Sequence, residues 1–408
     1  MEKLIYRLAA ETVDALTPLL SVLPGKTGRF FAGRTRPQQR EAWNHLRPGG
    51  IWIHAASAGE YEQAVPLIEY LRHRYPHMPL TVSFFSPSGY ERFSGKIPAQ
   101  TLYLPIDTPR NMRRFFDVLR PKAGIVMKYE FWPFMLEEAA RRKWPLFSAS
   151  AVFRPDQALW KHRFLKESLR AFEHFFVQDE TSARVLQQQG FTNSTVTGDT
   201  RFDTVAALPA RPVHFPVVES FKQNAKLLIA GSTWPEDEDK LLKIFRRLPP
   251  DWKLFVIPHE PSPRHIRRLR QRMPFSAALY SRFSPDSSDA RILIGDTTGL
   301  LKFVYRYADA AYVGGGFGKG IHNLLEAAVY GVPVVFGPVH QKFNEARDLI
   351  VEGGGFAADS DQQLERIILN LATDERMRRE AGRKAANYVR KNTGAAKKLM
   401  RVVEKYLS

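Results

Sequence analysis

Short apolar runs alternate with amphipathic segments along most of the 408 residues, and no other feature restricts the possible folds as strongly. Residues 51–56, 80–85 and 123–127 have the length and composition of buried strands, and helical patterns separate them. Strands that alternate with helices at this spacing form parallel sheets covered by helices on both faces. The sequence therefore predicts an α/β fold made of doubly wound parallel sheets.

The alternation occurs in two series, and a proline-rich stretch without apolar periodicity, Leu-Pro-Ala-Arg-Pro-Val-His-Phe-Pro at 208–216, lies between them. A chain of this length exceeds what one hydrophobic core usually supports. Ligands of open α/β sheets bind at the carboxyl ends of the strands, so we expect the chemistry in a cleft between two domains. We predict the following division: an N-terminal segment over 1–45, a first domain over 46–206, a linker over 207–222, a second domain over 223–390, and a final helix over 391–408 that packs back on the first domain.

The N-terminal segment is amphipathic. Its apolar residues, such as Leu4, Leu8 and Leu19, are interrupted by charges and by Pro18, and no run approaches the roughly 18 to 20 apolar residues of a spanning helix. Basic residues and an aromatic pair follow at 26–40. One interpretation is a helix that lies on an anionic membrane surface. The other is an ordinary packed helix.

The chain carries a formal net charge of +18 and has a sequence pI near 10.0. Such an excess favours an acidic partner: nucleic acid, anionic lipid or a phosphorylated substrate. The sequence lacks the aromatic platforms and recognition motifs of nucleic-acid-binding proteins, so we predict no nucleic-acid partner. Cysteine is absent, which excludes disulfides, cysteine metal sites and a thiol nucleophile.

A glycine-rich stretch, Val-Gly-Gly-Gly-Phe-Gly-Lys-Gly, begins at Val313. It follows an apolar strand over 310–313 and precedes a predicted helix over 323–330. Glycines at a strand-to-helix turn let backbone N–H groups approach a phosphate, and the start of a helix adds partial positive charge. The spacing fits neither the P-loop nor the G-x-G-x-x-G fingerprint. The alternative is a simple connecting turn.

Two other features of the second series admit both a functional and a structural interpretation. Ser232 and Thr233 could donate hydrogen bonds to a phosphate, or they could simply precede a helix that has Pro235 at its first position. Asp237 and Asp239 have the Asp-x-Asp spacing that can hold a divalent ion. Acidic residues in a first helical turn already have an electrostatic reason to be there, so we predict no metal.

Two glutamates follow strands of the first series. Glu60, in Ser-Ala-Gly-Glu at 57–60, could accept a proton from an acceptor hydroxyl. The alternative is a first-turn glutamate that forms a capping box with Ser57. Glu130 follows the strand over 123–127 and admits the same two interpretations.

Several motifs occur together in one order, and they cover nearly the whole chain: His-Ala-Ala-Ser-Ala-Gly-Glu at 54–60, Lys-Tyr-Glu-Phe-Trp-Pro at 128–133, Val-Thr-Gly-Asp-Thr-Arg-Phe-Asp at 196–203, Gly-Ser-Thr at 231–233, Asp-Thr-Thr-Gly at 296–299, Gly-Gly-Phe at 315–317 and His-Asn-Leu-Leu-Glu-Ala-Ala at 322–328. As a set they resemble the bacterial 3-deoxy-D-manno-octulosonic acid (Kdo) transferase family. That family transfers Kdo from CMP-Kdo to the lipid A precursor.

The resemblance implies a GT-B architecture, in which two Rossmann-like domains face a cleft. The first domain would bind the acceptor and the second the CMP-sugar. It implies an inverting glycosyltransferase of lipopolysaccharide inner-core synthesis that needs no cofactor or metal. Its partners would be CMP-Kdo, a lipid A precursor (lipid IVA) and an anionic membrane surface, and its location the cytoplasmic face of the bacterial inner membrane, as a peripheral or monotopic protein.

The resemblance also implies roles for individual residues. Glu60 matches the general base, and Glu130 and Arg201 match transition-state stabilisers. The donor-binding positions are Ser232, Thr233, Pro258, His259, Thr298, Gly299, Leu300, Gly315, Gly316, Phe317, His322, Asn323, Leu324, Leu325 and Glu326.

The chain departs from the family pattern at a few of these places. Arg201 stands where the family usually has lysine, so a planar fork replaces a point charge. Leu300 stands where the family has a carboxylate, and His259 stands where it has an arginine; both groups are expected near the nucleotide. On the acceptor side, residues 150–154 replace an Asn-Ala-Arg pattern. The alternative function is a GT-B nucleotide-sugar transferase or epimerase with a UDP-type donor.

Overall fold

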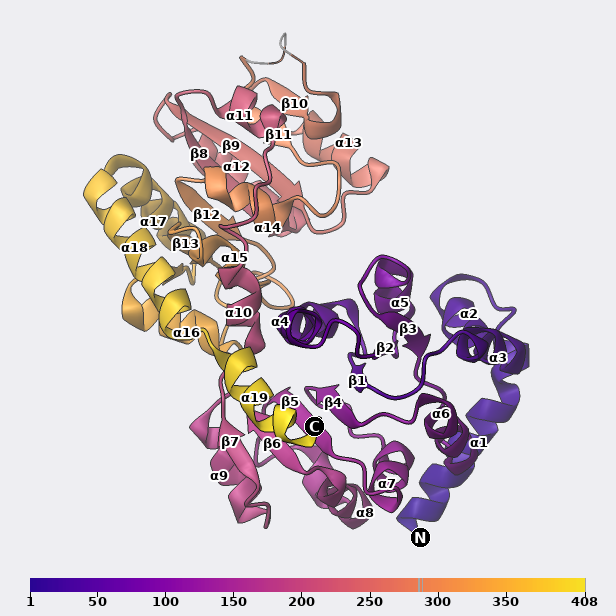
Figure 1. Cartoon of the computed structure of the whole chain (residues 1–408). Helices are drawn as coiled ribbons and strands as arrows, with labels where there is room; N and C mark the ends of the chain where they lie inside the picture. Colours follow the sequence, from indigo (N-terminus) through magenta and orange to yellow (C-terminus); the bar gives the residue numbers. More distant parts are fainter. Residues whose placement is uncertain (285–286, 288, 408) are drawn as a thin grey trace. The chain divides into compact units, whose positions relative to one another are not determined.

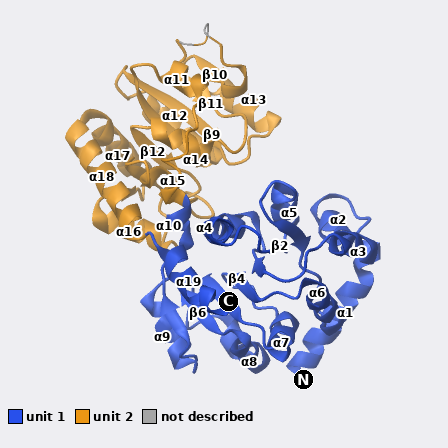
Figure 2. Ribbon diagram, in the orientation of Figure 1, with its two compact units in different colours: residues 1–204, 393–408 blue, residues 205–392 orange. Residues whose placement is uncertain are grey.

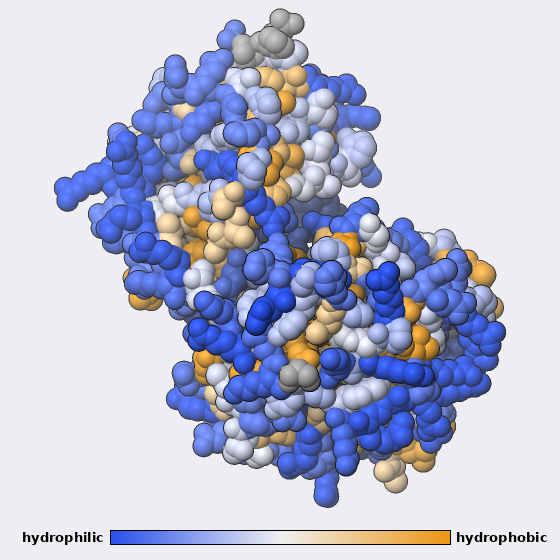
Figure 3. All heavy atoms as spheres, in the orientation of Figure 1, coloured by the Kyte–Doolittle hydropathy of each residue, from blue (hydrophilic) through white to orange (hydrophobic). Residues whose placement is uncertain are grey.

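The computed structural model describes residues 1–284, 287 and 289–407, which form two compact units (Figures 1 and 2). Unit 1 comprises Met1–Thr204 and Thr393–Ser408, and unit 2 comprises Val205–Asn392. Each unit contains one parallel sheet covered by helices, so the predicted α/β fold is confirmed. Hydrophilic side chains cover most of the face seen in Figure 3, in keeping with 60 lysine and arginine residues.

The sheet of unit 1 has seven strands in the order β3-β2-β1-β4-β5-β6-β7. The chain reverses its direction of travel across the sheet between β1 and β4, and this switch point is where α/β sheets bind ligands. In the register of the central strands, His54 of β1 lies beside Ser83 of β2 and Val126 of β4. The strands are β1 (Ile51–His54), β2 (Leu80–Phe84), β3 (Gln100–Tyr103), β4 (Ala123–Met127), β5 (Leu146–Ala151), β6 (His174–Val177) and β7 (Ser194–Val196).

Two apolar cores pack against the two faces of this sheet. One joins strand residues such as Ile53 and Ile125 to helices α4, α5 and α19. The other joins residues such as Trp52 and Val126 to α6, α7 and α9. The helices are α1 (Glu2–Leu20), α2 (Gly25–Ala32), α3 (Arg36–Asn44), α4 (Ala58–Arg74), α5 (Pro87–Phe93), α6 (Pro109–Leu119), α7 (Pro133–Arg141), α8 (Arg163–Ser168), α9 (Glu180–Gln188), α10 (Thr200–Ala206) and α19 (Ala395–Val403), with short 3-10 turns at Ala158–Lys161, Leu169–Ala171 and Glu404–Tyr406.

The sheet of unit 2 also has seven strands, in the order β10-β11-β9-β8-β12-β13-β14, and its switch point lies between β8 and β12. Helices α12, α13 and α17 cover one face. The strands are β8 (Lys226–Thr233), β9 (Trp252–Pro258), β10 (Ala277–Leu279), β11 (Ile292–Ile294), β12 (Ala310–Val313), β13 (Val334–Phe336) and β14 (Gly355–Ala357). The helices are α11 (Pro216–Lys222), α12 (Pro235–Phe245), α13 (Pro263–Gln271), α14 (Leu301–Val304), α15 (Leu325–Ala328), α16 (Asn344–Glu352), α17 (Asp361–Thr373) and α18 (Glu375–Lys391), with 3-10 turns at Tyr280–Arg282 and Tyr305–Tyr307.

Some elements differ from the predicted ones. The helix predicted over 323–330 is the single turn α15, because Leu324 is its N-cap and Gly331, at φ 74°, follows its end. The stretch predicted as a linker contains helix α11, whose Val218 and Phe221 are fully buried in unit 2. The final helix α19 packs in the first core of unit 1 through Leu399 and neighbouring residues.

Helix α1 contacts the rest of unit 1 through polar side chains and through the ring of Tyr6, which packs near Phe134 and Phe164. The hydroxyl of Tyr6 donates to Asp107 at 2.8 Å, and the amide of Asn111 donates to Asp14 at 2.8 Å. The apolar side chains of this helix remain outside: Leu8 is 55% and Leu19 67% exposed. Within the described part of the chain, no helix has the length and apolar character to cross a membrane.

Candidate functional site

Glu60 lies in the first turn of α4, directly after the loop at the carboxyl end of β1. One carboxylate oxygen accepts a hydrogen bond from the backbone N–H of Ser57 at 3.1 Å, and the Ser57 hydroxyl accepts one from the backbone N–H of Glu60 at 3.4 Å. This is the capping box that the sequence offered as the structural interpretation. The functional interpretation stays open, because one carboxylate can cap a helix and still exchange a proton.

Glu130 lies beyond the carboxyl end of the neighbouring strand β4. Lys128 turns the chain there in the left-handed region, at φ 54°. The indole N–H of Trp132 donates to the Glu130 carboxylate at 2.8 Å, and Nε2 of His54 lies 3.7 Å from the same oxygen. Glu60 and Glu130 therefore follow the two strands that flank the switch point of unit 1.

The environment pushes the pKa values of these carboxyls in opposite directions. Burial and then the charge of Glu130 raise the pKa of Glu60, against smaller opposing effects of His54 and Lys128. Burial also acts to raise the pKa of Glu130, but contacts with His54 and Trp132 outweigh it and hold that pKa below its usual value. Two carboxyls with divergent pKa values are a common basis for dividing the roles of base and fixed charge.

The role of His54 was not predicted from the sequence. Its ring is fully buried, and Nδ1 lies 2.8 Å from the hydroxyl oxygen of Ser83 on the adjacent strand. The same hydroxyl accepts a hydrogen bond from the indole N–H of Trp52 at 2.8 Å. The signal was present as a histidine in an apolar strand six residues before Glu60, but only the register of β1 and β2 reveals its contacts.

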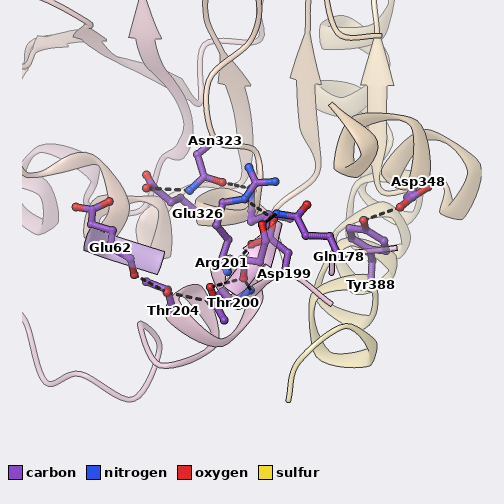
Figure 4. A network of polar contacts seen from close by, with 12 residues as sticks. Glu62, Gln178, Asp199, Thr200, Arg201, Thr204, Asn323, Glu326, Asp348 and Tyr388 are labelled. Carbon is purple, nitrogen blue, oxygen red and sulfur yellow. Dashed lines mark hydrogen bonds and ion pairs between the residues drawn. The ribbon is translucent and has the colours of Figure 1, made fainter. Parts of the chain in front are cut away.

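Arg201 lies in α10, and Figure 4 shows it beside Asp199. Its Nε donates to one oxygen of the Asp199 carboxylate at 2.7 Å, and its backbone N–H donates to the other at 2.8 Å. Its side chain is 25% exposed, against 6% for Asp199. The buried aspartate thus fixes the guanidinium while leaving part of it open to solvent.

In unit 2, Ser232 and Thr233 lie at the end of β8, and Ser232 adopts a left-handed conformation at φ 52°. The hydroxyl of Thr233 donates to the buried carboxylate of Glu238 at 3.0 Å. The other oxygen of Glu238 lies 2.9 Å from Nε2 of His265. The hydroxyl hydrogen of Thr233 therefore has an acceptor within the protein. Ser232 carries the other hydroxyl at this strand end that could meet a ligand.

The glycine loop after β12 is held largely by its own backbone. The N–H groups of Gly318 and Gly320 both donate to the carbonyl of Gly315 at 3.0 Å, and the N–H of Gly315 donates to Asp237 at 2.9 Å. A Cβ on Gly316 would lie 2.6 Å from the backbone nitrogen of Gly337, so close chain approach requires glycine there. These three N–H groups therefore have acceptors within the protein, so the loop would have to meet a phosphate through other donors.

Three aromatic rings meet beside this loop. The rings of His259 and His322 stack with centroids 4.3 Å apart, and Trp234 lies 5.0 Å from His259. The indole N–H of Trp234 donates to Nε2 of His322 at 3.3 Å, which places the imidazole proton on Nδ1. Burial and then the proximity of His259 lower the pKa of His322 to about 4, so its ring is neutral at pH 7.

The remaining predicted donor-binding residues line or support the same edge of unit 2. The side chain of Asn323 donates to Glu326 at 3.2 Å and accepts from the backbone of Leu325 at 3.1 Å (Figure 4). Leu324 and Leu325 are fully buried, so they can contribute only by shaping the backbone. Pro258 ends β9, Phe317 lies in the glycine loop, and Thr298, Gly299 and Leu300 connect β11 to α14.

No cluster of three or more His, Cys, Asp or Glu side chains suited to a metal ion occurs among the residues that the structure describes. Asp237 of the Asp-x-Asp pair accepts hydrogen bonds from Tyr312, Trp234 and Gly315. Both carboxylate oxygens of Asp237 therefore already accept hydrogen bonds from groups of the protein.

Comparison with known proteins gives a consistent result. Residues 27–204 match the family model of the 3-deoxy-D-manno-octulosonic-acid transferases (kdotransferase). A 3-deoxy-D-manno-octulosonic acid transferase of Haemophilus influenzae is 29% identical over 381 residues and 88% of each chain, and one of Bordetella pertussis is 28% identical over 380 residues, 88% of this chain and 87% of the other. The predicted resemblance is confirmed.

Solved structures agree on the fold. UDP-GlcNAc 2-epimerase of Neisseria meningitidis bound to UDP-GlcNAc superposes with a TM-score of 0.62 at 14% identity, covering 88% of this chain and 100% of the other. Acinetobacter baumannii MurG gives a TM-score of 0.57 at 12% identity, with the same coverage. At these identities the likeness concerns architecture alone, and the predicted GT-B class is confirmed.

Proposed function

We propose that this chain is a Kdo transferase, as its similarity to that family suggests, and that it moves Kdo from CMP-Kdo to a lipid A precursor with inversion at the anomeric carbon. The observation that carries the proposal is the pair Glu60 and Glu130 at the carboxyl ends of β1 and β4, with pKa values displaced in opposite directions. A site of this kind can supply a proton acceptor and a fixed negative charge together.

In this proposal Glu60 takes the proton from an acceptor hydroxyl as that oxygen attacks the anomeric carbon of Kdo. Glu130 remains ionised because its pKa is lowered, and its charge stabilises the positive charge that develops on the sugar ring. Arg201, fixed by Asp199, stabilises the negative charge on the departing CMP.

The donor would bind unit 2 at the edge formed by β8, β9 and β12. Ser232 offers a hydroxyl, and the neutral ring of His322 offers an Nδ1–H and an aromatic face beside His259. Asn323 and Glu326 form a hydrogen-bonded pair there that suits a ribose or base edge. CMP leaves with a single phosphate, for which hydroxyl, backbone and guanidinium donors suffice.

The acceptor and the membrane would meet unit 1. Lipid IVA is an anionic glycolipid, and the chain has a net charge of +18. Exposed Leu4, Ile5, Leu8, Leu16 and Leu19 form an apolar stripe on α1, whose polar side is fixed to unit 1. We infer that this stripe lies in the interface of the cytoplasmic leaflet of the inner membrane.

The test is to incubate the chain with freshly generated CMP-Kdo and lipid IVA, and in parallel with UDP-GlcNAc. Mass spectrometry detects and counts the added sugars, and NMR coupling of the product gives the anomeric configuration. Kdo addition with inversion, lost in Glu60→Gln, supports the proposal. Retention of configuration would overturn the inverting mechanism, and turnover of UDP-GlcNAc alone would favour the UDP-type alternative.

A further inference from the structure

His54 presents a buried nitrogen to the two carboxylates of unit 1. Its ring is fully buried, and Nε2 has no hydrogen-bond partner among the described residues. The nearest carboxylate oxygen belongs to Glu130, 3.7 Å away. A buried polar atom usually has a hydrogen-bond partner. The position of His54 Nε2, just beyond hydrogen-bond distance of the Glu130 carboxylate, therefore calls for an explanation.

The hydrogen bonds on the other side of the ring determine where its proton lies. Ser83 Oγ accepts the indole N–H of Trp52 at 2.8 Å, and its own hydroxyl hydrogen remains to be placed. Nδ1 of His54 is 2.8 Å from this oxygen. Nδ1 also lies 3.2 Å from the backbone carbonyl of Ser83, which can only accept, but its shorter contact is with the hydroxyl. If that hydroxyl donates to Nδ1, the neutral ring carries its proton on Nε2, facing the Glu130 carboxylate. The other tautomer would set a nitrogen lone pair against the carboxylate.

We propose that His54 is a positioning residue, held by Ser83 and Trp52, that fixes the Glu130 carboxylate through Nε2–H and so sets the electrostatic balance between Glu130 and Glu60. The link from this balance to sugar transfer rests on the proposed function. The contact itself rests only on the geometry of β1, β2 and the segment after β4.

The surrounding charges agree with this assignment. His54 lowers the pKa of both carboxyls, which are the negative groups that face it. Lys128 also lowers the pKa of Glu60, and Trp132 is the other donor to Glu130. Loss of the His54 nitrogen should therefore raise both carboxyl pKa values, while Lys128 and Trp132 keep part of the effect.

The experiment measures the two carboxyls directly, by NMR titration of the full chain labelled with ¹³C at glutamate Cδ. Glu60→Gln and Glu130→Gln each remove one signal and so assign it. In His54→Asn the amide can still reach Ser83 but nothing reaches Glu130, whereas His54→Gln can direct an amide N–H toward Glu130. We expect the Glu130 midpoint to rise by about half a pH unit or more in His54→Asn and by less in His54→Gln.

Two serines provide a test that leaves the histidine in place. Ser83 and Ser148 are both fully buried in the same sheet, and they lie in one row, because Ser83 pairs with His54, His54 with Val126 and Val126 with Ser148. Only Ser83 contacts the imidazole. Ser83→Ala should raise the Glu130 midpoint by releasing the ring, and Ser148→Ala should leave it unchanged. Far-ultraviolet circular dichroism confirms that each variant is folded.

A Glu130 midpoint that stays at the parent value in folded His54→Asn and Ser83→Ala would overturn the inference. Transfer assays add a second readout: kcat should fall about 10- to 100-fold in His54→Asn with the KM for CMP-Kdo unchanged, and His54→Gln should recover part of it. If the carboxyl midpoints move but the parent chain transfers no Kdo, the positioning role stands and the proposed function fails.

Discussion

The buried carboxylate of Asp237 accepts a hydrogen bond from the backbone N–H of Gly315 at 2.9 Å. The same oxygen accepts the backbone N–H of Trp234 at 2.9 Å, and the other oxygen accepts the hydroxyl of Tyr312. One side chain thus joins the start of α12 to the glycine loop after β12, so the shape of the proposed donor site depends on it.

Asp237→Asn tests this dependence. An amide retains one acceptor oxygen and places an NH₂ group against hydrogens that the carboxylate accepts, so we expect a loss of about 1–3 kcal/mol in the free energy of unfolding and roughly tenfold weaker CMP binding. Urea unfolding and titration calorimetry with CMP measure the two effects. Glu236→Gln removes the same charge from an exposed position in the same turn and should cost at most about 0.5 kcal/mol. Equal behaviour of the two variants would contradict the prediction.

Glu60→Gln separates the two roles of that side chain. Glutamine can keep the capping box with Ser57, so stability should change little, but it cannot accept a proton, so kcat should fall about 10²- to 10⁴-fold. Ser57→Ala is the reverse control: it removes a cap, at a cost of about 1 kcal/mol, and leaves the carboxylate in place. Steady-state assays with thermal unfolding of both variants compare the effects. Activity retained in Glu60→Gln would exclude Glu60 as the base.

The pH dependence of transfer should reflect the raised pKa of Glu60. A base acts only when deprotonated, so kcat/KM should rise with pH through a midpoint above the ordinary value of 4.5. Glu130, whose pKa is lowered, is already ionised over that range. A profile of kcat/KM against pH for the parent chain measures the midpoint. A midpoint at or below 4.5 would show that another group limits the rate.

Asp107 should make the stability of unit 1 depend on pH. Burial raises its pKa from 3.8 to about 6, against the hydrogen bonds from Phe134, Tyr6 and Met135. Between these values the folded state retains a proton that the unfolded chain has lost, so the stabilising contribution present below pH 3.8 is lost as pH rises through 6. The change is on the order of 3 kcal/mol. Urea unfolding of the parent and of Asp107→Asn at several pH values gives the difference, and a pH dependence that is the same in both would refute it.

The apolar stripe on α1 should govern binding to vesicles. Leu8→Glu places a charge where the proposed membrane contact lies. We therefore expect a roughly tenfold lower affinity for vesicles of phosphatidylcholine and phosphatidylglycerol, measured as the fraction of protein that co-sediments with them. Val351→Glu makes the same change at a residue of unit 2 that is 87% exposed, and should have no effect. Both sites are exposed, so stability should stay within about 0.5 kcal/mol. Unchanged sedimentation of Leu8→Glu would remove α1 from the membrane contact.

The sequence was sufficient for the central elements of both sheets. The predicted boundaries of β4 agree with the structure, because a continuous apolar run is a strong local signal. The strands β7, β10 and β14 were missed. Each has three residues and lies at a sheet edge. An edge strand forms hydrogen bonds with only one neighbouring strand, so it needs only a short apolar sequence.

The candidate site was predictable only in part. The positions of Glu60 and Glu130 after β1 and β4 were predicted, because strand ends are recognisable from local sequence. The contacts of His54 depend on the pairing of β1 with β2, and those of Asp237 on the placement of β12 beside β8. Such relationships join residues far apart in the chain, and no local pattern encodes them.

Helix α19 gives the chain an unusual order of assembly. Ala396, Leu399, Met400 and Val403 complete an apolar core that residues 51–176 begin, and all of unit 2 lies between these segments in sequence. During synthesis on the ribosome, unit 2 therefore emerges in full before unit 1 has its last core helix. The first half must wait, with an apolar face of its sheet and of α4 open to chaperones or to aggregation, until the second half has been made.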